Sequence, residues 1–304
     1  MSQFQAIGSI GVPSPPPIVA IPASPGYWRS VWGRLQRDPV TVAVGILLLT
    51  IFFVTAFAPL VATQDPTTGS VIGRLQPIGS AGHWLGTDET GRDMWARLAY
   101  GGRLSLLTGV APVTISLLIG GILGITAGYA GGLVGTLIMR TMDVFYAFPS
   151  ILLAIAICGM LGSGLFNSVL ALALVFIPPM VRISETVTSQ CRHLDFVEAA
   201  RASGTTTSQI IRHHMLANVL GPILVYATSL ISLSIILSAG LSFLGLGVTP
   251  PAAEWGLMLN SLRQSIYVQP YVAALPGLMI FVTSMCFNLT ADGLRSAMDV
   301  RLAH

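Results

Sequence analysis

Lysine is absent from this chain of 304 residues, and all 15 of its basic side chains are arginine. A P-loop that cradles nucleotide phosphates needs a lysine, and so does an enzyme that forms a Schiff base with its substrate. The sequence therefore excludes both kinds of site. If ATP drives this protein, another chain must bind the nucleotide.

Charge of either sign is also scarce. Only 9% of the residues are charged, 53% are hydrophobic, and the mean hydropathy is +0.76. A soluble domain carries about a quarter charged residues, so this composition is typical of a membrane protein. We expect an all-α integral membrane protein, and neither a catalytic residue nor a nucleic-acid partner is predicted.

Cysteine is sparse, and its three copies do not form a framework. Cys158 and Cys286 lie in apolar segments, whereas Cys191 lies in a polar one. Their spacing matches neither a zinc site nor a set of disulfides. We interpret them as small buried hydrophobic residues, and no metal or cofactor is expected.

The N-terminal region divides into two parts. Residues 1–26 are uncharged and rich in Pro, Ser and Gly, which predicts a disordered cytoplasmic tail rather than a signal peptide. In residues 27–39, Trp28, Trp32 and Leu35 share one helical face and the arginines lie mainly off it. This pattern predicts an amphipathic helix in the lipid headgroup layer, and an ordinary charge cluster beside the membrane is the alternative.

Long charge-free segments predict the membrane spans. They occupy residues 40–62, 104–127, 144–181, 219–244 and 271–290. A segment of this kind reaches about 34 Å over 23 helical residues, enough to cross the hydrocarbon core. Gly162 and Gly164 divide the third segment into two spans, so we expect six transmembrane helices. The Gly- and Pro-rich segment 245–270 is a candidate for a re-entrant or interfacial helix.

Arginine placement predicts the orientation of these spans. An even number of spans puts both termini on one side. With the N-terminus inside, ten arginines face the cytoplasm and five face the exterior. Cytoplasmic loops usually carry the excess of positive charge, so both termini are predicted to be cytoplasmic.

A polar segment between two spans, residues 195–218, then faces the cytoplasm. Asp195 and Glu198 resemble a capping box that begins a short helix, and Gly204 suits the left-handed residue that ends one. Thr206 and Gln209 offer a second box that begins the next helix. A short rigid helix on the membrane surface, continuous with a span, would transmit an applied force.

The residues EAARASG in this segment resemble the EAA loop of bacterial ABC importer permeases. Further motifs resemble the C-type permease of the dipeptide, oligopeptide and nickel branch: HWLGTDETGRDMWARLAYGGRLSL, DVFYAFPSILLAIAI, LSFLGLGVTPPAAEWGLML and FNLTADGLRSAMDVRL. The family pattern continues with a proline where this chain has Ala217 after Met215 and Leu216, which predicts a less kinked second helix.

This resemblance implies a type I importer permease fold with a cytoplasmic EAA coupling helix. Residues 40–62 would form the first span, 63–103 an extracytoplasmic loop, and 104–302 the permease core, with a coupling loop at 182–218. The residues that carry the coupling role by resemblance are Glu198, Ala199, Ala200 and Gly204.

The implied partners are two ABC ATPase subunits or a fused pair, a B-type permease in a heterodimer, an extracytoplasmic solute-binding protein and the lipid bilayer. The implied location is the bacterial inner membrane. The solute stays open among dipeptides, longer peptides, glutathione-like molecules and chelated nickel, and no substrate-contacting residue is named.

Several charged residues have two interpretations. Arg140 with Asp143, and Asp292 with Arg295, are spaced for ion pairs within one helix, and a gate or solute contact is the alternative. Arg182 and Glu185 bracket the inner end of the fourth span, where they could hold the coupling helix. His213 and His214 point about 100° apart on a helix, which is poor geometry for one metal ion.

Two other regions are also open. Loop 63–103 is either a docking surface for the binding protein or a folded structural cap. The small residues of the spans either line a polar path or allow close helix packing.

Two other functional classes are less compatible with the sequence. A proton-coupled transporter or channel would need charges near the middle of the membrane, and the predicted span centres have none. An intramembrane serine protease would need a histidine at membrane depth, yet all five histidines lie outside the predicted spans.

Overall fold

The computed structural model of the protein describes residues 27–298. The expected tail at 1–26 and the last residues of the expected core, 299–302, lie outside this range. The helices are α1 (Tyr27–Leu35), α2 (Pro39–Ala56), α3 (Ala58–Val61), η1 (Val71–Gly73), α4 (Met94–Ala130), α5 (Gly132–Tyr146), α6 (Ser150–Leu161), α7 (Leu165–Arg192), α8 (Asp195–Ala202), α9 (Thr207–Gln209), η2 (Ile210–Met215), α10 (Leu216–Phe243), α11 (Trp255–Ser261), η3 (Gln264–Tyr267) and α12 (Pro270–Met298).

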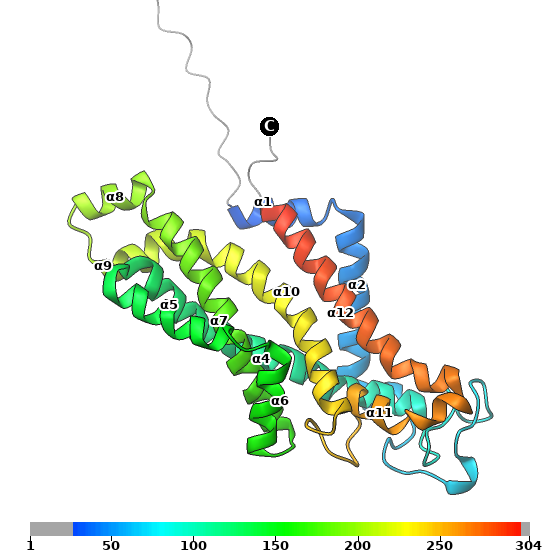
Figure 1. Ribbon diagram of the computed structural model, residues 1–304. Helices are drawn as coiled ribbons and strands as arrows, with labels where there is room; N and C mark the ends of the chain where they lie inside the picture. The colour runs from blue at the N-terminus through cyan, green and yellow to red at the C-terminus, as the bar shows by residue number, and fades with distance from the viewer. Residues whose placement is uncertain (1–26, 299–304) are drawn as a thin grey trace, which may run out of the picture.

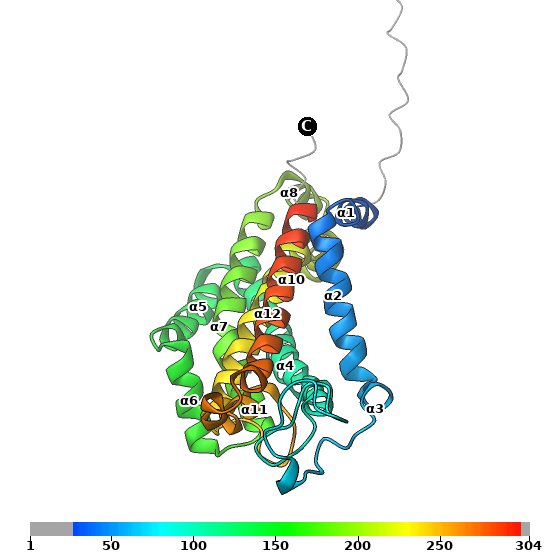
Figure 2. The same cartoon turned by 90° about the vertical axis from the view of Figure 1, so that its right-hand side faces the viewer.

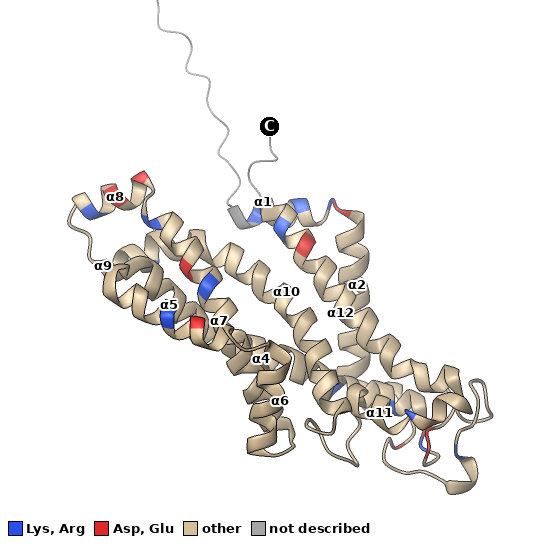
Figure 3. Cartoon of the chain, in the orientation of Figure 1, with Lys and Arg blue, Asp and Glu red and all other residues tan. Residues whose placement is uncertain are grey.

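The long helices form a bundle with two distinct ends (Figure 1). Helices α1 and α8 and the end of α12 lie at one end, which we call the α8 end. The loop between α3 and α4, together with α11, lies at the other end, which we call the cap end. In Figure 3, α2, α10 and most of α12 carry no charge along their length. The arrangement therefore places an apolar belt between two polar ends.

The expected helical membrane fold is confirmed. Five helices are long and apolar enough to cross a membrane, and α5 and α6 raise this number to six if the bent pair counts as one span. Within residues 27–298 the only β-pairing consists of isolated bridges in the loop before α4.

The third span differs from the prediction. A continuous helix from residue 144 was expected, but α5 and α6 meet at an angle of 83°. Pro149 causes this break, because it has no N–H to donate and it disfavours the helical conformation at Phe148. Helix α6 has only 12 residues and spans about 18 Å, too short to cross the hydrocarbon core alone.

Helix α4 begins ten residues before the expected start of the core. Asp93 caps this helix, because its carboxylate accepts a hydrogen bond of 2.8 Å from the backbone N–H of Ala96. The first turns of α4 therefore occupy the end of the segment that was expected to be a loop. The first span is also shorter than expected, since α2 ends at Ala56 and a separate turn, α3, follows.

The segment 245–270 contains the short helix α11, packed against the bundle rather than exposed on it. Trp255 is fully buried, and its indole N–H donates to the carbonyl oxygen of Leu98 at 3.0 Å. Glu254, also buried, accepts from the backbone N–H groups of Gly256 and Leu257 at 2.9 and 2.8 Å. Ser105 of α4 donates to the same carboxylate at 3.1 Å. These bonds attach α11 to α4.

Helices α4 and α7 pack most extensively, through small residues. Gly120, Gly124 and Gly128 lie one turn apart along α4 and face α7. A Cβ added at Gly128 would lie 2.6 Å from the carbonyl oxygen of Glu185 and 2.8 Å from the Cβ of Thr188. Close packing therefore accounts for these small residues.

Replacing Gly128 with leucine should separate α4 from α7. We expect Gly128→Leu to lower stability by at least about 1–3 kcal/mol, the usual cost of overpacking. The measurement is the fraction of detergent-solubilised protein that stays monodisperse after heating. Gly45→Leu is the matched control, because a Cβ at Gly45 on α2 meets nothing within 4 Å. Equal behaviour of the two variants would contradict the packing argument.

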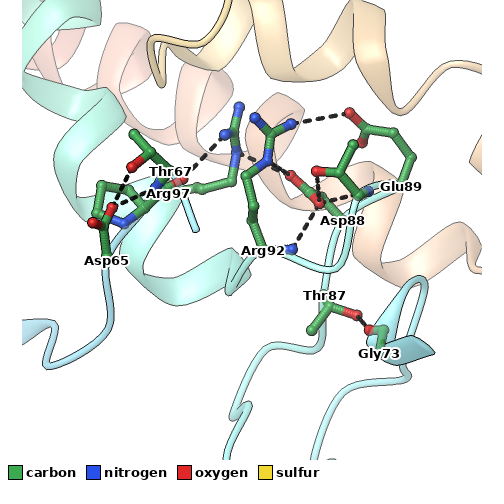
Figure 4. Close-up of polar contacts among 10 residues, drawn as sticks. Asp65, Thr67, Gly73, Thr87, Asp88, Glu89, Arg92 and Arg97 are labelled. Carbon is green, nitrogen blue, oxygen red and sulfur yellow. Dashed lines mark hydrogen bonds and ion pairs between the residues drawn. The ribbon is translucent and has the colours of Figure 1, made fainter. Parts of the chain in front are cut away.

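The loop at the cap end is folded around buried charges (Figure 4). Asp88 is 1% exposed and its carboxylate pairs with Arg92 at 2.6 Å and with Arg97 at 3.2 Å. The backbone N–H of Arg92 also donates to Asp88 at 2.9 Å. Burial is the main cause that raises the pKa of Glu89, and repulsion from the neighbouring Asp88 carboxylate raises it further. We call residues 63–93 with Arg97 the cap, and these buried pairs hold it in a folded structure.

Candidate functional site

The expected coupling residues lie on and just after α8, at the α8 end of the bundle (Figure 1). Glu198, Ala199 and Gly204 are exposed. Ala200 is only 9% exposed and faces the bundle together with the fully buried Val197. Three of the four predicted residues are therefore accessible to a partner, and the fourth seats the helix on the bundle.

The predicted capping box at the start of α8 is wrong. Leu194 occupies the N-cap position, and no side chain caps the helix. The carbonyl oxygen of Leu194 instead accepts from the backbone N–H groups of Val197 and Glu198, at 2.9 and 3.2 Å. Asp195 and Glu198 both lie in the first turn, where negative charge interacts favourably with the positive end of the helix dipole. The carboxylates remain exposed and free to meet a partner.

The predicted end of α8 at Gly204 is confirmed. Gly204 has a φ of +80°, a conformation that costs little only for glycine and a few polar residues. Its N–H donates to the carbonyl oxygen of Arg201 at 3.1 Å, and the N–H of Thr205 donates to that of Ala200 at 3.1 Å. This pair of bonds is a Schellman motif, which ends the helix at a fixed place.

The second helix of the segment begins where the sequence predicted. Thr206 is its N-cap, and the side chain of Gln209 accepts from the Thr206 backbone N–H at 3.3 Å and from its hydroxyl at 2.9 Å. A π-helical turn, η2, then leads into α10. His213 and His214 on this turn are exposed. No group of three or more metal-ligating side chains occurs among residues 27–298.

Helix α8 is seated on an apolar cluster that reaches deep into the bundle. Val197 and Ala200 pack with Cys191 of α7, and with Ile210 and Met215 of η2. The same cluster continues through α7 and α10. Helix α8 is therefore packed against the end of α7 and against η2, the turn that leads into α10.

One ion pair was missed by the sequence analysis. Arg182 of α7 donates to Asp143 of α5 at 2.7 Å, and its guanidinium lies 4.6 Å from the centre of the Tyr146 ring. Arg140 also approaches Asp143, at 3.6 Å, as its spacing predicted. Arg182 therefore joins two helices. Two arginines, Arg140 and Arg182, thus share the carboxylate of Asp143. The spacing of Arg140 and Asp143 already accounted for that carboxylate within one helix, so nothing in the sequence pointed to Arg182 as a second partner.

The second predicted pair within one helix is not formed. Asp292 and Arg295 lie on the described part of α12, and no ion pair joins them. Both side chains are exposed at the α8 end. An open groove of about 420 Å³ lies near Arg140 and Asp143, between α4, α5 and α7, and Glu185 lines it. Arg140, Asp143 and Glu185 are therefore accessible from this groove.

Known proteins resemble this chain along nearly all of its length. A family model described as a binding-protein-dependent transport system inner membrane component matches residues 120–304. A second, described as the N-terminal TM domain of oligopeptide transport permease C, matches residues 26–77.

Two curated relatives cover most of the chain. The glutathione transport system permease protein GsiD of Pectobacterium atrosepticum is 41% identical, over 90% of this chain and 91% of the relative. The dipeptide transport system permease protein DppC of Alkalihalophilus pseudofirmus is 42% identical, over 95% and 94%. A chain of the MetNI methionine ABC transporter, solved in an inward-facing conformation, shares the fold with a TM-score of 0.55 at 18% identity, over 66% of this chain and 96% of that chain.

Proposed function

The chain belongs to the family of binding-protein-dependent transport system inner membrane components, and we propose that it is one of two permease subunits in an ATP-driven importer. This membership confirms the resemblance read from the sequence motifs, and the permease C match agrees with the C-type branch. In this role the chain forms half of the translocation pathway. It is a non-catalytic subunit, and separate ATPase subunits hydrolyse ATP.

The geometry of α8 is the observation that supports coupling. Helix α8 has eight residues and is about 12 Å long, ends in a Schellman motif and is seated on a buried cluster. Its outer face presents Glu198 and Ala199 to a partner. We infer that an ATPase cleft receives this face, so that its closure moves α7 and α10.

The remaining partners follow from this assignment. We propose that the α8 end and both termini face the cytoplasm, where two ATPase subunits dock. A B-type permease completes the pathway as a heterodimer. The solute-binding protein docks at the cap, where Ile72 is 98% exposed and Trp84 is 76% exposed. Large apolar side chains exposed at a polar end of the molecule are typical of a contact surface.

The proposed solute is a small peptide. Two relatives that are 41% and 42% identical to this chain are named for glutathione and for dipeptide transport, and both names denote short peptides. We therefore propose di- or oligopeptides, including glutathione-like molecules, as the class. Selection within the class falls first to the binding protein.

Reconstituted uptake tests this function. The complete complex in proteoliposomes should take up peptide only with ATP, a hydrolysis-competent ATPase and the binding protein. Transport by this chain alone would contradict the proposal and favour a secondary transporter or channel.

Charge reversal at Glu198 tests the docking face directly. We expect Glu198→Arg to stay in the membrane, because the side chain is exposed, and to bind the ATPase at least about tenfold less tightly, a loss of about 1.4 kcal/mol. The measurement is recovery of the ATPase with the purified permease. Asp292→Arg is the control, since Asp292 is an exposed carboxylate near the end of α12 that lies at the α8 end of the bundle. Equal recovery from both variants would count against docking at α8.

A further inference from the structure

Helix α8 contacts the end of α4 as well as the end of α7 and the η2 turn that leads into α10. The guanidinium of Arg201, on the last turn of α8, lies 5.8 Å from the centre of the Tyr129 ring, in the last turn of α4. Tyr129 is half-buried and packs against the cluster that contains Val197 and Ala200. A cation over an aromatic face is attracted by the ring quadrupole. The ring is therefore held between α8 and the bundle.

A glycine hinge follows this contact immediately. Gly131 and Gly132 join α4 to α5, with φ values of +60° and +51°. Such values favour glycine, and glycine also absorbs changes in backbone angle at little cost. Arg192, at the end of α7, lies against the hinge: a Cβ added at Gly131 would lie 2.6 Å from its Nη1. The hinge is thus contacted by the helix that leads into α8.

Helix α5 is held to α7 beyond the hinge as well. The pair between Arg182 and Asp143 joins the far part of α5 to α7. Arg182 and Arg192 are ten residues apart, or about 15 Å along α7. The 83° bend then connects α5 to α6. A rotation at the hinge would move α5 and α6 relative to α7.

We propose that Arg201 and Tyr129 are positioning residues that pass the displacement of α8 to the hinge at Gly131 and Gly132, and so to α5. The proposal rests on the importer function and extends it to a second route, parallel to the direct push on α7 and α10. The ring is the transmitting element, because it is the part that Arg201 contacts. Its hydroxyl is not required.

Paired substitutions separate transmission from docking. We expect Tyr129→Leu to leave ATPase recovery unchanged and to lower peptide uptake per ATP hydrolysed at least about threefold, within the range of coupling changes from single residues. Tyr129→Phe keeps the ring and should match the wild type. Arg201→Gln, on the exposed side of the contact, should lower uptake per ATP hydrolysed as much as Tyr129→Leu does. The double variant should lower this ratio no further than either single variant.

A structural readout accompanies the kinetics. Spin labels at Phe196→Cys and Leu137→Cys report the distance between α8 and α5, since both positions are exposed and neither is a proposed docking residue. The nucleotide-dependent distance change should be present in the wild type and reduced by Tyr129→Leu.

The outcomes distinguish this proposal from the importer function. Wild-type uptake without dependence on ATP would overturn both. ATP-dependent uptake with an unchanged uptake ratio and distance change in Tyr129→Leu would overturn the transmission role alone. Loss of ATPase recovery in Tyr129→Leu or Arg201→Gln would assign the contact to docking and also overturn it.

Discussion

Replacing Gly204 with proline is expected to reduce ATP-dependent uptake at least about tenfold, while the permease stays in the membrane. Proline fixes φ near −65°, whereas Gly204 has a φ of +80°. Proline also lacks the N–H that Gly204 donates to the carbonyl oxygen of Arg201. The Schellman motif would be lost, and the outer face of α8 would no longer be held in one orientation.

A second substitution at the same position is the control. Gly204→Asn should retain most of the uptake, because asparagine tolerates positive φ and a Cβ there meets nothing within 4 Å. Membrane insertion is checked by the amount of monodisperse permease, and coupling by uptake in proteoliposomes. Equal uptake by the proline and wild-type proteins would show that the end of α8 needs no fixed geometry.

The end of α8 and the start of the next helix could be predicted because each depends on residues close together in the sequence. The end of α8 depends on Gly204, and the start of the next helix depends on the hydrogen bond between Thr206 and Gln209. Charge-free length likewise predicted α2, α7, α10 and α12, because a helix that crosses the lipid needs about 20 consecutive apolar residues.

Features that depend on distant partners were not predictable from the sequence. The inward direction of Ala200 depends on where α8 lies on the cluster, and Arg182 meets Asp143 only because α5 folds back towards α7. The prediction that Asp195 caps the start of α8 was also wrong. Aspartate is a good N-cap, but here the preceding backbone carbonyl begins the helix and Asp195 becomes its first residue.

The break between α5 and α6 shows how composition misled the prediction. Residues 144–161 are free of charge and read as one span by hydropathy. A single proline at 149 outweighs that signal, since it removes a helical hydrogen bond and restrains Phe148. The bend gives α5 a direction different from α6, and α5 packs against α7, where Asp143 meets Arg182.

The cap gives the second large prediction. Asp88→Leu is expected to destabilise the cap by about 3–5 kcal/mol, because removing one partner of a buried ion pair leaves the other charge uncompensated. Arg97, 2% exposed, would then keep only its hydrogen bond of 3.2 Å to the carbonyl oxygen of Pro66. The backbone N–H groups of Thr90 and Arg92 would also lose their acceptor. Cleavage of the solubilised protein within residues 63–93 by a non-specific protease measures the effect.

Asp65→Leu provides the matched control within the same loop. Asp65 is exposed and accepts hydrogen bonds from its near neighbours Thr67 (Figure 4) and Thr68, so its loss exposes no buried charge. We expect rapid cleavage of the Asp88 variant and wild-type resistance in the Asp65 variant. If both resist equally, the buried pairs do not hold the cap together. A cleaved cap should also lower uptake, because the binding protein would lose the surface at Ile72 and Trp84 on which we propose that it docks.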